Sequence, residues 1–360
     1  MNPEPEARWV RCPVCLERFA WREDELWLPT GEVGGYERLD LEKVNDPLKR
    51  RDIRRNSYQR CPNPSQDTEP HHLPASYLDY KPPLVIGIVG RTESGKTHLL
   101  TSIIAELLRG GLQPHGLTAQ AMDYMQHRRF QVEQLDQLAQ GKELPGTRHG
   151  LTGFAAVLLV SSPAGTWPVT FFDIAGEDFL SVGDTGKAGR FLIGASAVMF
   201  VETPEDALGV SRENAERQAE SNATFARVLA RLKDLPHAAE LPVCVVLNKS
   251  DRLRYVPPVD KWIRRQDDGE LDAAALLEES RDFYGFLSQH RADSSLTPFH
   301  EFPLCTLHFV SATGSESIGK RFVRGVRAMR VLRPLVALLA MSGVLDGPEA
   351  RKVGRWYDSV

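Results

Sequence analysis

Short apolar runs and amphipathic stretches alternate along the chain from about residue 82 onward. Most of the runs are continuously apolar and rich in β-branched residues, as expected for strands covered on both faces of a sheet. After the first run, Leu and Ile recur at helical spacing, and Gly110-Gly111 ends that helix. This alternation predicts βα units around a mostly parallel sheet. The six predicted strands span residues 84–89, 154–160, 169–174, 196–202, 242–248 and 306–312.

Two stretches interrupt this alternation. Residues 119–142 have the pattern of a polar amphipathic helix, and residues 252–303 are helix-like and separate the fifth strand from the sixth. The first 80 residues are rich in Arg, Pro, Trp and acids and show no sustained period. We therefore divide the chain into a cysteine-containing module with a linker, an α/β domain with a helical insertion, and a tail. These parts cover residues 1–80, 81–345 with the insertion at 252–303, and 346–360.

Bulk composition limits the partners and the location. The 360 residues are 42% hydrophobic and 26% charged with a net charge of -4, which gives no reason to expect nucleic acid or an anionic membrane as a partner. The longest apolar segment, residues 331–345, is too short to span a membrane and carries Arg333 and Pro334, so it predicts a packed helix. The first ten residues lack the features of a signal peptide. We therefore expect a cytoplasmic protein.

The first predicted strand ends in "GRTESGKT", which fits the phosphate-loop pattern G-x-x-x-x-G-K-[ST]. Glycines let successive backbone N–H groups curl around phosphate oxygens, and the following helix presents its positive N-terminus. We expect Lys96 to reach the β- and γ-phosphates and Thr97 to hold Mg²⁺. The predicted phosphate-binding residues are Gly90, Arg91, Thr92, Glu93, Ser94, Gly95, Lys96, Thr97 and His98.

The base is indicated by "LNKSD" at the end of the fifth strand. An Asp carboxylate accepts two parallel hydrogen bonds from guanine, whereas adenine offers no such pair of donors, so Asp251 predicts guanine. We expect Asn248 to supply an amide to the base and the loop, and Lys249 to cover the ring. "VSATG" closes the sixth strand, where Ser311 would fix the turn and the Ala312 N–H would meet the guanine carbonyl oxygen. Thr313 completes the predicted base-binding set.

The segment "VTFFDIAGED" places Asp173 at a strand end in a D-x-x-G arrangement. We expect Asp173 to bind Mg²⁺ through a water and the Gly176 N–H to touch the γ-phosphate. Losing that phosphate would release the loop, so the segment predicts a nucleotide-dependent switch.

The ordered set GxxxxGKT, DxxG, NKxD and SAT resembles the Ras-like, TRAFAC class of P-loop GTPases over roughly residues 82–345. The resemblance implies a six-stranded, mostly parallel sheet flanked by helices, GTP and GDP as ligands, and Mg²⁺. It also implies a switch I threonine, for which Thr147 is our choice and Thr152 the alternative. "DIAGED", the preceding "LPGT" and the N-terminal cysteines resemble the bacterial double-GTPase families. Those families are proposed to act as paired GTPases in multi-protein conflict or signalling systems, which implies protein effectors or a second GTPase as partners.

Two positions depart from the Ras-like pattern. Glu177 stands where those enzymes place a water-orienting Gln, and its charge repels the γ-phosphate, so we expect slow hydrolysis without a partner. Thr92 replaces a usual Gly and crowds the path of a partner's arginine finger. Arg91 is interpreted as a solvated loop residue, and the alternative is that it supplies positive charge to the site itself. The predicted activity is GTP hydrolysis, with Lys96, Thr147, Gly176 and Glu177 as the catalytic residues. The alternative is a GTP-binding scaffold without hydrolysis.

The five cysteines divide into two kinds. Two of them, Cys244 and Cys305, lie in apolar runs and predict reduced core residues. The other three lie in polar, turn-rich sequence. In a reducing cytosol this pattern favours a metal-binding site over disulfide bonds. They are Cys12, Cys15 and Cys61.

The spacing of these three cysteines, with His71 and His72 about ten residues after the third, suits tetrahedral Zn²⁺. We favour His72 over His71 as the fourth ligand, and free cysteines are the alternative. Zinc would stabilise a segment that lacks a large apolar core. We interpret the basic stretch 46–60 as a solvated helix face or linker. A protein-docking segment is the second interpretation, and an RNA-binding strip is the third.

Overall fold

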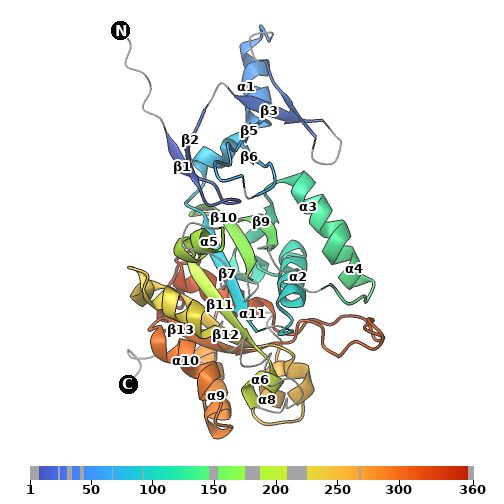
Figure 1. Cartoon of the computed structure of the whole chain (residues 1–360), viewed down its shortest axis with the longest axis vertical. Helices are drawn as coiled ribbons and strands as arrows, with labels where there is room; N and C mark the ends of the chain where they lie inside the picture. The colour runs from blue at the N-terminus through green and yellow to red at the C-terminus, as the bar shows by residue number, and fades with distance from the viewer. Residues whose placement is uncertain are drawn as a thin grey trace.

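A mixed, mostly parallel sheet forms the centre of the computed structural model (Figure 1). Its strands are β7 (Leu84–Gly90), β8 (Thr118–Ala121), β9 (Gly153–Ser162), β10 (Gly165–Ile174), β11 (Ala197–Glu202), β12 (Val243–Leu247) and β13 (Cys305–Phe309). The order across the sheet is β13-β12-β11-β7-β10-β9-β8. The first five strands are mutually parallel, and β9 is antiparallel to both of its neighbours. The structure describes residues 8–22, 25–30, 35–40, 44–66, 68–91, 93–145, 153–174, 187–208, 225–266 and 269–355.

All six predicted strands are present, and β8 adds a seventh at the edge. The prediction of six strands, with a helix starting at residue 119, is therefore wrong at this edge. The four residues of β8 alternate between polar and apolar, but the stretch is too short to be told from the start of a helix, and its conformation is set by pairing with β9, where Ala119 lies opposite Val160. The helical pattern begins only afterwards, as α3 (Tyr124–Phe130), a π-helical turn (Gln131–Leu135) and α4 (Asp136–Ala139).

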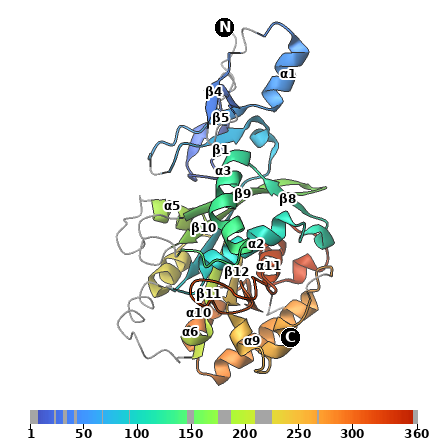
Figure 2. The ribbon, with the colours of Figure 1, turned by 90° about the vertical axis from the view of Figure 1, so that its right-hand side faces the viewer.

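Helices cover both faces of the sheet (Figures 1 and 2). One face packs against α2 (Lys96–Leu108) and α11 (Leu332–Met341). The other packs against α5 (Lys187–Gly194), α6 (Pro204–Leu208), a helix over 225–233, α8 (Val259–Ile263), α9 (Ala273–Gln289) and α10 (Asp293–Glu301). Every residue of β7, β11 and β12 is buried, which explains why these strands are continuously apolar apart from Glu202. Each buried Leu, Ile or Phe side chain contributes about 1.5–3 kcal/mol of stability.

Residues 252–303 contain helices, and the described part of this segment has no strand. Of these helices, α9 packs directly on β13, and its Phe283 and Phe286 belong to the core on that face. We therefore regard α9 as an integral covering helix of the α/β domain. The apolar segment 331–345 contains α11, which is almost wholly buried. No helix in the described ranges is long and apolar enough to cross a membrane.

The residues before β7 form a small module at one end of the molecule (Figure 2). A hairpin and a four-stranded sheet make up its strands. They are β1 (Trp9–Arg11), β2 (Arg18–Ala20), and, in sheet order, β4 (Tyr36–Arg38), β3 (Leu26–Pro29), β5 (Tyr58–Arg60) and β6 (His72–Pro74). Phe19, Trp21 and Tyr77 share one apolar cluster with Val157 and Leu159 of β9. The core of the module therefore continues onto the edge of the central sheet.

The basic stretch 46–60 contains α1 (Pro47–Arg55), which buries none of its residues. Asp46 caps this helix by accepting from the Leu48 N–H at 2.9 Å. An exposed helix rich in Arg fits the interpretation of a solvated face.

Candidate nucleotide site and cysteine cluster

The phosphate loop begins where β7 meets the neighbouring strand β11. A Cβ atom at Gly90 would lie 2.5 Å from the Val201 carbonyl oxygen and 2.8 Å from the Ser94 hydroxyl. Only glycine fits this approach, which explains the first glycine of the motif. The loop then runs into α2, which begins at Lys96 and whose N-cap, Gly95, has no side chain to accept from the first backbone N–H groups of the helix.

Gly95 and Asn248 lie in close contact at the start of α2. Gly95 adopts φ +79°, the left-handed region that favours glycine, and a Cβ atom there would lie 2.7 Å from the Asn248 side-chain nitrogen. The second glycine of the motif is therefore required both by its backbone conformation and by the neighbour that packs on it.

Lys96 is folded back over the loop. Its ammonium donates to the carbonyl oxygens of Gly90 at 2.9 Å and Arg91 at 3.0 Å, and the side chain is buried. The loop thus carries a fixed positive charge at the place where the motif predicts phosphate binding. The hydroxyl of Ser94 is also buried in this loop.

Asn248 joins the phosphate loop to the loop after β13. Its Nδ2 donates to the Ser94 carbonyl oxygen at 2.9 Å, and its Oδ1 accepts from the Ala312 N–H at 3.1 Å. Ser102 of α2 adds a second link by donating to the Ala312 carbonyl oxygen at 2.8 Å. In this structure the Ala312 N–H is therefore directed to Asn248, whereas the sequence suggested that it would face the guanine carbonyl oxygen.

Asp251 is buried directly after β12, and the Ser311 hydroxyl donates to its Oδ1 at 2.6 Å. Ser311 also accepts from the Gly314 N–H at 2.8 Å, so the same hydroxyl fixes its own turn and the carboxylate. The bond to Asp251 was missed from sequence, although both residues stand at strand ends of one sheet edge, which was the available signal. Lys249 extends across this edge and donates to the Glu93 carbonyl oxygen at 2.8 Å.

Arg91 is buried and forms an ion pair with Glu202, the last residue of β11. Its guanidinium also lies 5.0 Å from the centre of the Phe225 ring. The interpretation of Arg91 as a solvated loop residue is therefore wrong. The signal was Glu202 itself, an acid at the end of an apolar strand that needs a partner when buried.

His98 follows Thr97 on α2, and its Nε2 accepts from the Leu144 N–H at 3.0 Å. Burial lowers the pKa of His98, in keeping with a neutral ring that can accept this bond. The histidine thereby fixes the chain shortly before the predicted switch I segment.

Several predicted site residues lie outside the described residues. They are Thr92, Thr147, Thr152, Gly176, Glu177 and all of the switch II loop after residue 174. The backbone of Asp173 is described as part of β10, where it lies beside Ile88 of β7. Its position in the chain is therefore near the carboxyl end of the strand that leads into the phosphate loop.

A second candidate site lies in the N-terminal module, where three sulfurs and one imidazole nitrogen all lie within 4.8 Å of one another. They belong to Cys12, Cys15, Cys61 and His71, and all four residues are buried. The Cys15 and Cys61 sulfurs are 3.7 Å apart, and Cys12 Sγ is 3.1 Å from His71 Nε2. Hydrogen bonds from Cys12 and Cys15 lower the pKa of Cys61 to about 4.

The choice of His72 as the fourth member of this cluster is wrong. His72 points away and stacks on Tyr36 with ring centres 3.8 Å apart. His71 precedes β6, and its carbonyl oxygen accepts from the Cys61 N–H at 3.0 Å, so the backbone pairing that continues from β5 and β6 places His71 beside Cys61. Neighbouring residues of an extended chain face opposite ways, so His72, which lies opposite Arg60, faces away from the cysteines. His71 Nδ1 donates to the Glu69 carbonyl oxygen at 2.8 Å, which leaves Nε2 free to accept or to bind a metal. The other two cysteines, Cys244 and Cys305, are free and buried in the central sheet, as predicted.

The phosphate loop, the Asn248 bridge and the buried Asp251 carboxylate define a P-loop GTPase on an α/β sheet. The chain belongs to the Double-GTPase 2 family, which it matches over residues 84–292. Membership implies guanine nucleotide and Mg²⁺ as ligands and interaction with other proteins.

One solved structure that resembles the chain is "Signal recognition particle receptor SRb-GTP/SRX complex from Chaetomium thermophilum". It is 15% identical, the match covers 67% of this chain and 96% of that one, and the TM-score is 0.31. At that score the likeness adds nothing to the assignment. No curated protein matches the chain.

Proposed function

We propose that this protein is a GTP-hydrolysing regulatory switch of the Ras-like, TRAFAC type. The observation that carries the proposal is the placement of Asp251. Its carboxylate is buried, is oriented by Ser311, and lies on the same sheet edge as the phosphate loop. Asn248 joins the phosphate loop to Ala312, the residue after Ser311. A carboxylate held in this way accepts the N1–H and the exocyclic amine of guanine, and adenine leaves it unpaired.

The residues around the phosphates have defined tasks in this proposal. Lys96 exchanges the carbonyl oxygens that it now contacts for oxygens of the β- and γ-phosphates. The loop N–H groups and the N-terminus of α2 stabilise the remaining phosphate charge. Thr97, Asp173 and the switch I threonine, Thr147 or Thr152, offer the oxygen ligands that Mg²⁺ prefers. When bound, Mg²⁺ neutralises charge that develops on the phosphates.

Hydrolysis proceeds by in-line attack of water on the γ-phosphate, giving GDP and phosphate. The Gly176 N–H contacts the γ-phosphate, and Glu177 accepts a proton from the water. A carboxylate beside the γ-phosphate raises the barrier through like-charge repulsion, so turnover is slow until a partner acts. The second candidate is a scaffold that binds GTP without hydrolysing it, which the residues Glu177 and Thr92 favour.

The Cys12, Cys15, Cys61 and His71 cluster is proposed as a structural zinc site. Four zinc ligands at tetrahedral angles place two thiolates about 3.8 Å apart, given Zn–S bonds of about 2.3 Å. The Cys15 to Cys61 separation of 3.7 Å fits this geometry without movement. The proposed output of the switch is binding of a protein effector or a second GTPase in a multi-protein bacterial system, with the protein in the cytoplasm.

The base preference is tested by calorimetric titration of the full chain with GDP, XDP and ADP. Wild type should prefer GDP, and Asp251→Asn should shift preference from GDP to XDP by about two orders of magnitude, because an amide donates to the xanthine 2-oxo group. Asp234→Asn changes an exposed acid away from the site and is the matched control. A wild type that binds ADP as tightly as GDP would overturn the guanine assignment.

The two candidate functions are separated by single-turnover release of phosphate from GTP. Slow but measurable release that Glu177→Gln strongly reduces supports a catalytic glutamate. Unchanged or faster release in that variant contradicts a catalytic role for Glu177. Absence of release over many hours, with tight GTP binding, favours the scaffold.

A further inference from the structure

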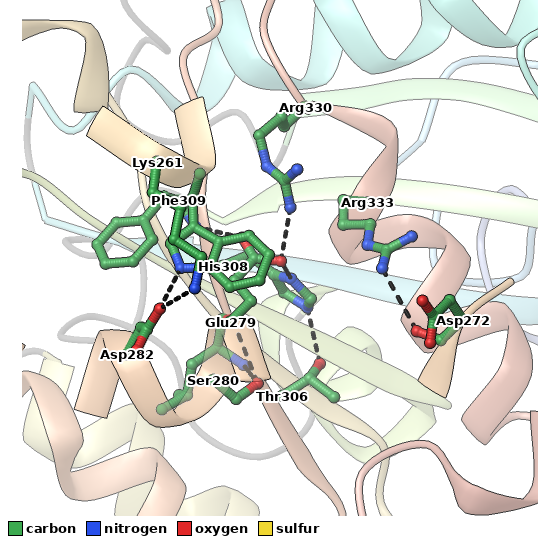
Figure 3. Close-up of polar contacts among 12 residues, drawn as sticks. Lys261, Asp272, Glu279, Ser280, Asp282, Thr306, His308, Phe309, Arg330 and Arg333 are labelled. Atoms are coloured by element: carbon green, nitrogen blue, oxygen red, sulfur yellow. Dashed lines mark hydrogen bonds and ion pairs between the residues drawn. The ribbon is translucent and has the colours of Figure 1, made fainter. Parts of the chain in front are cut away.

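The loop after β13, residues 311–314, is the guanine loop. A buried carboxylate outside the nucleotide site connects the two chain segments on either side of it. Glu279 lies on α9 and is fully buried (Figure 3). Its Oε1 accepts from the Phe309 N–H at 3.0 Å, and its Oε2 lies 2.7 Å from the Arg330 guanidinium. One carboxylate therefore contacts the segment that enters the loop and the segment that leaves it.

Phe309 is the last residue of β13, two positions before Ser311. The residue between them, Val310, is bonded to β12 and to the turn that follows it: its N–H donates to the Leu247 carbonyl oxygen, and its own carbonyl oxygen accepts from the Ser250 N–H. The Glu279 contact at Phe309 thus fixes the strand end from which Ser311 projects toward Asp251.

The returning segment pairs with the guanine loop through its backbone. Met329 donates to the Ser311 carbonyl oxygen at 2.8 Å and accepts from the Ser311 N–H at 3.0 Å. The Arg327 N–H donates to the Thr313 carbonyl oxygen at 2.9 Å. Arg330 follows immediately, so its ion pair with Glu279 anchors the backbone that holds Ser311 in place.

Arg330 also adopts φ +59°, a left-handed conformation that is unfavourable for any residue with a side chain. The surrounding contacts must keep it there, and Figure 3 shows its guanidinium pointing at Glu279. The guanidinium further lies 5.5 Å from the centre of the Trp262 ring. Glu279 also contacts His308, whose Nδ1 lies 3.4 Å from the Glu279 Oε2. These contacts make the pair part of a fully buried network and not a surface bridge.

We propose that Glu279 and Arg330 are positioning residues for guanine selectivity. They hold Ser311 where its hydroxyl orients the Asp251 carboxylate, and they touch neither base nor phosphate themselves. This inference rests on the proposed guanine site, because it assigns these residues a part in that site's discrimination.

The test compares GDP with IDP, which lacks the 2-amino group that one Asp251 oxygen would accept. The ratio of the two affinities reports the alignment of Asp251, whereas a general loosening of the fold weakens both ligands together. For the full chain, Glu279→Gln and Arg330→Met should lower the GDP to IDP ratio by about fivefold or more, since a hydrogen bond to a charged group is worth about tenfold or more in affinity. Arg330→Lys keeps the charge and should restore part of the ratio.

Glu278→Gln is the matched control, because it removes a neighbouring acid from α9 that is exposed and pairs with Lys261. It should leave the ratio at the wild-type value. Where a single variant leaves a buried charge unpaired and does not fold, the double variant Glu279→Gln with Arg330→Met removes both charges and is measured instead. Melting temperatures of all variants accompany the titrations.

The outcomes separate this inference from the function on which it rests. A wild type that does not prefer GDP over ADP overturns both. A wild-type guanine preference together with an unchanged GDP to IDP ratio in folded Glu279 and Arg330 variants overturns only the positioning role. Equal weakening of GDP and IDP in those variants also overturns it, since that result assigns the pair to general stability.

Discussion

Asn248 occupies the space that a side chain at Gly95 would need. Its Nδ2 lies 2.7 Å from the position of a Cβ atom on Gly95, whose φ is +79°. The same amide donates to the Ser94 carbonyl oxygen and holds the guanine loop through Ala312. The phosphate loop and the guanine loop are therefore held in a fixed relative position by one side chain, Asn248.

Gly95→Ala should weaken GDP binding by more than tenfold, because the new methyl group displaces Asn248 from both loops. The left-handed backbone adds a cost of about 1–2 kcal/mol in stability. Gly116→Ala is the matched control: Gly116 has a similar φ of +70°, and a Cβ atom there meets nothing within 4 Å. Titration with GDP should show normal affinity for that variant. Similar affinity losses in both variants would mean that backbone strain, and not the Asn248 contact, weakens binding.

The buried ion pair between Arg91 and Glu202 should contribute strongly to the free energy of unfolding. Glu202→Gln removes the carboxylate charge beside the buried Arg91 guanidinium, which costs about 3–5 kcal/mol in unfolding free energy. Urea denaturation followed by circular dichroism measures this loss. Glu133→Gln, which breaks an exposed bridge to Arg129, should leave the midpoint unchanged. A loss below about 1 kcal/mol for Glu202→Gln would show that the pair is not needed.

The sequence predicts the central strands because a strand covered on both faces must be apolar throughout, and β7, β11 and β12 meet that demand. It fails at β8, because an edge strand of four residues takes its conformation from pairing with β9 and not from its own side chains. Local pattern therefore predicts structure where burial is two-sided, and loses that power at the edge of the sheet.

The candidate site shows a similar division. Motif spacing brings Lys96, Asn248 and Asp251 to one sheet edge, since the carboxyl ends of parallel strands meet there. The contacts between motifs, such as Ser311 with Asp251 and Arg91 with Glu202, depend on side-chain directions across neighbouring strands. The sequence offers hints, such as the acid Glu202 at the end of an apolar strand, but not the side-chain directions that join Glu202 to Arg91.

Replacement of His71 should lower the zinc content of the protein, whereas replacement of His72 should not. His71→Ala removes the proposed fourth zinc ligand, whose Nε2 is 3.1 Å from the Cys12 sulfur, and should lower the zinc content of the purified protein below one equivalent. His72→Ala removes the neighbouring ring, which stacks on Tyr36, and should keep full zinc content. Metal is measured by mass spectrometry and a chromogenic chelator. Full zinc in His71→Ala, or equal loss in both variants, contradicts the assignment.

Removing the metal should also destabilise the module. With zinc withdrawn by a strong chelator, three thiols and an imidazole remain in a buried cluster that no longer has its cross-link. The melting transition should shift downward, and addition of Zn²⁺ should restore it. The Cys61→Ser variant should melt at the lower temperature with or without chelator. A chelator that leaves the wild-type transition unmoved would exclude a structural metal.

Stability should fall on mild acidification, in part through His308. Burial lowers the pKa of His308, although the neighbouring Glu279 opposes that effect, and Arg333 and Arg330 add to it. Below about pH 6.5 the unfolded chain binds a proton at this histidine and the native state does not. The contribution of His308 to the unfolding free energy is therefore fully present above that pH. It decreases as pH falls, by at most about 1.4 kcal/mol per pH unit for one such group.

His308→Gln removes this one titrating group, so its stability should change less between pH 7 and pH 5 than that of the wild type. Other buried or half-buried histidines with lowered pKa keep their contribution in both proteins; they are His72, His98, His115 and His127. His300→Gln, which replaces an exposed histidine, is the control and should follow the wild-type curve. Urea midpoints measured at half-unit pH steps provide the comparison. Parallel curves for wild type and His308→Gln would mean that the native ring takes up its proton as readily as the unfolded chain does.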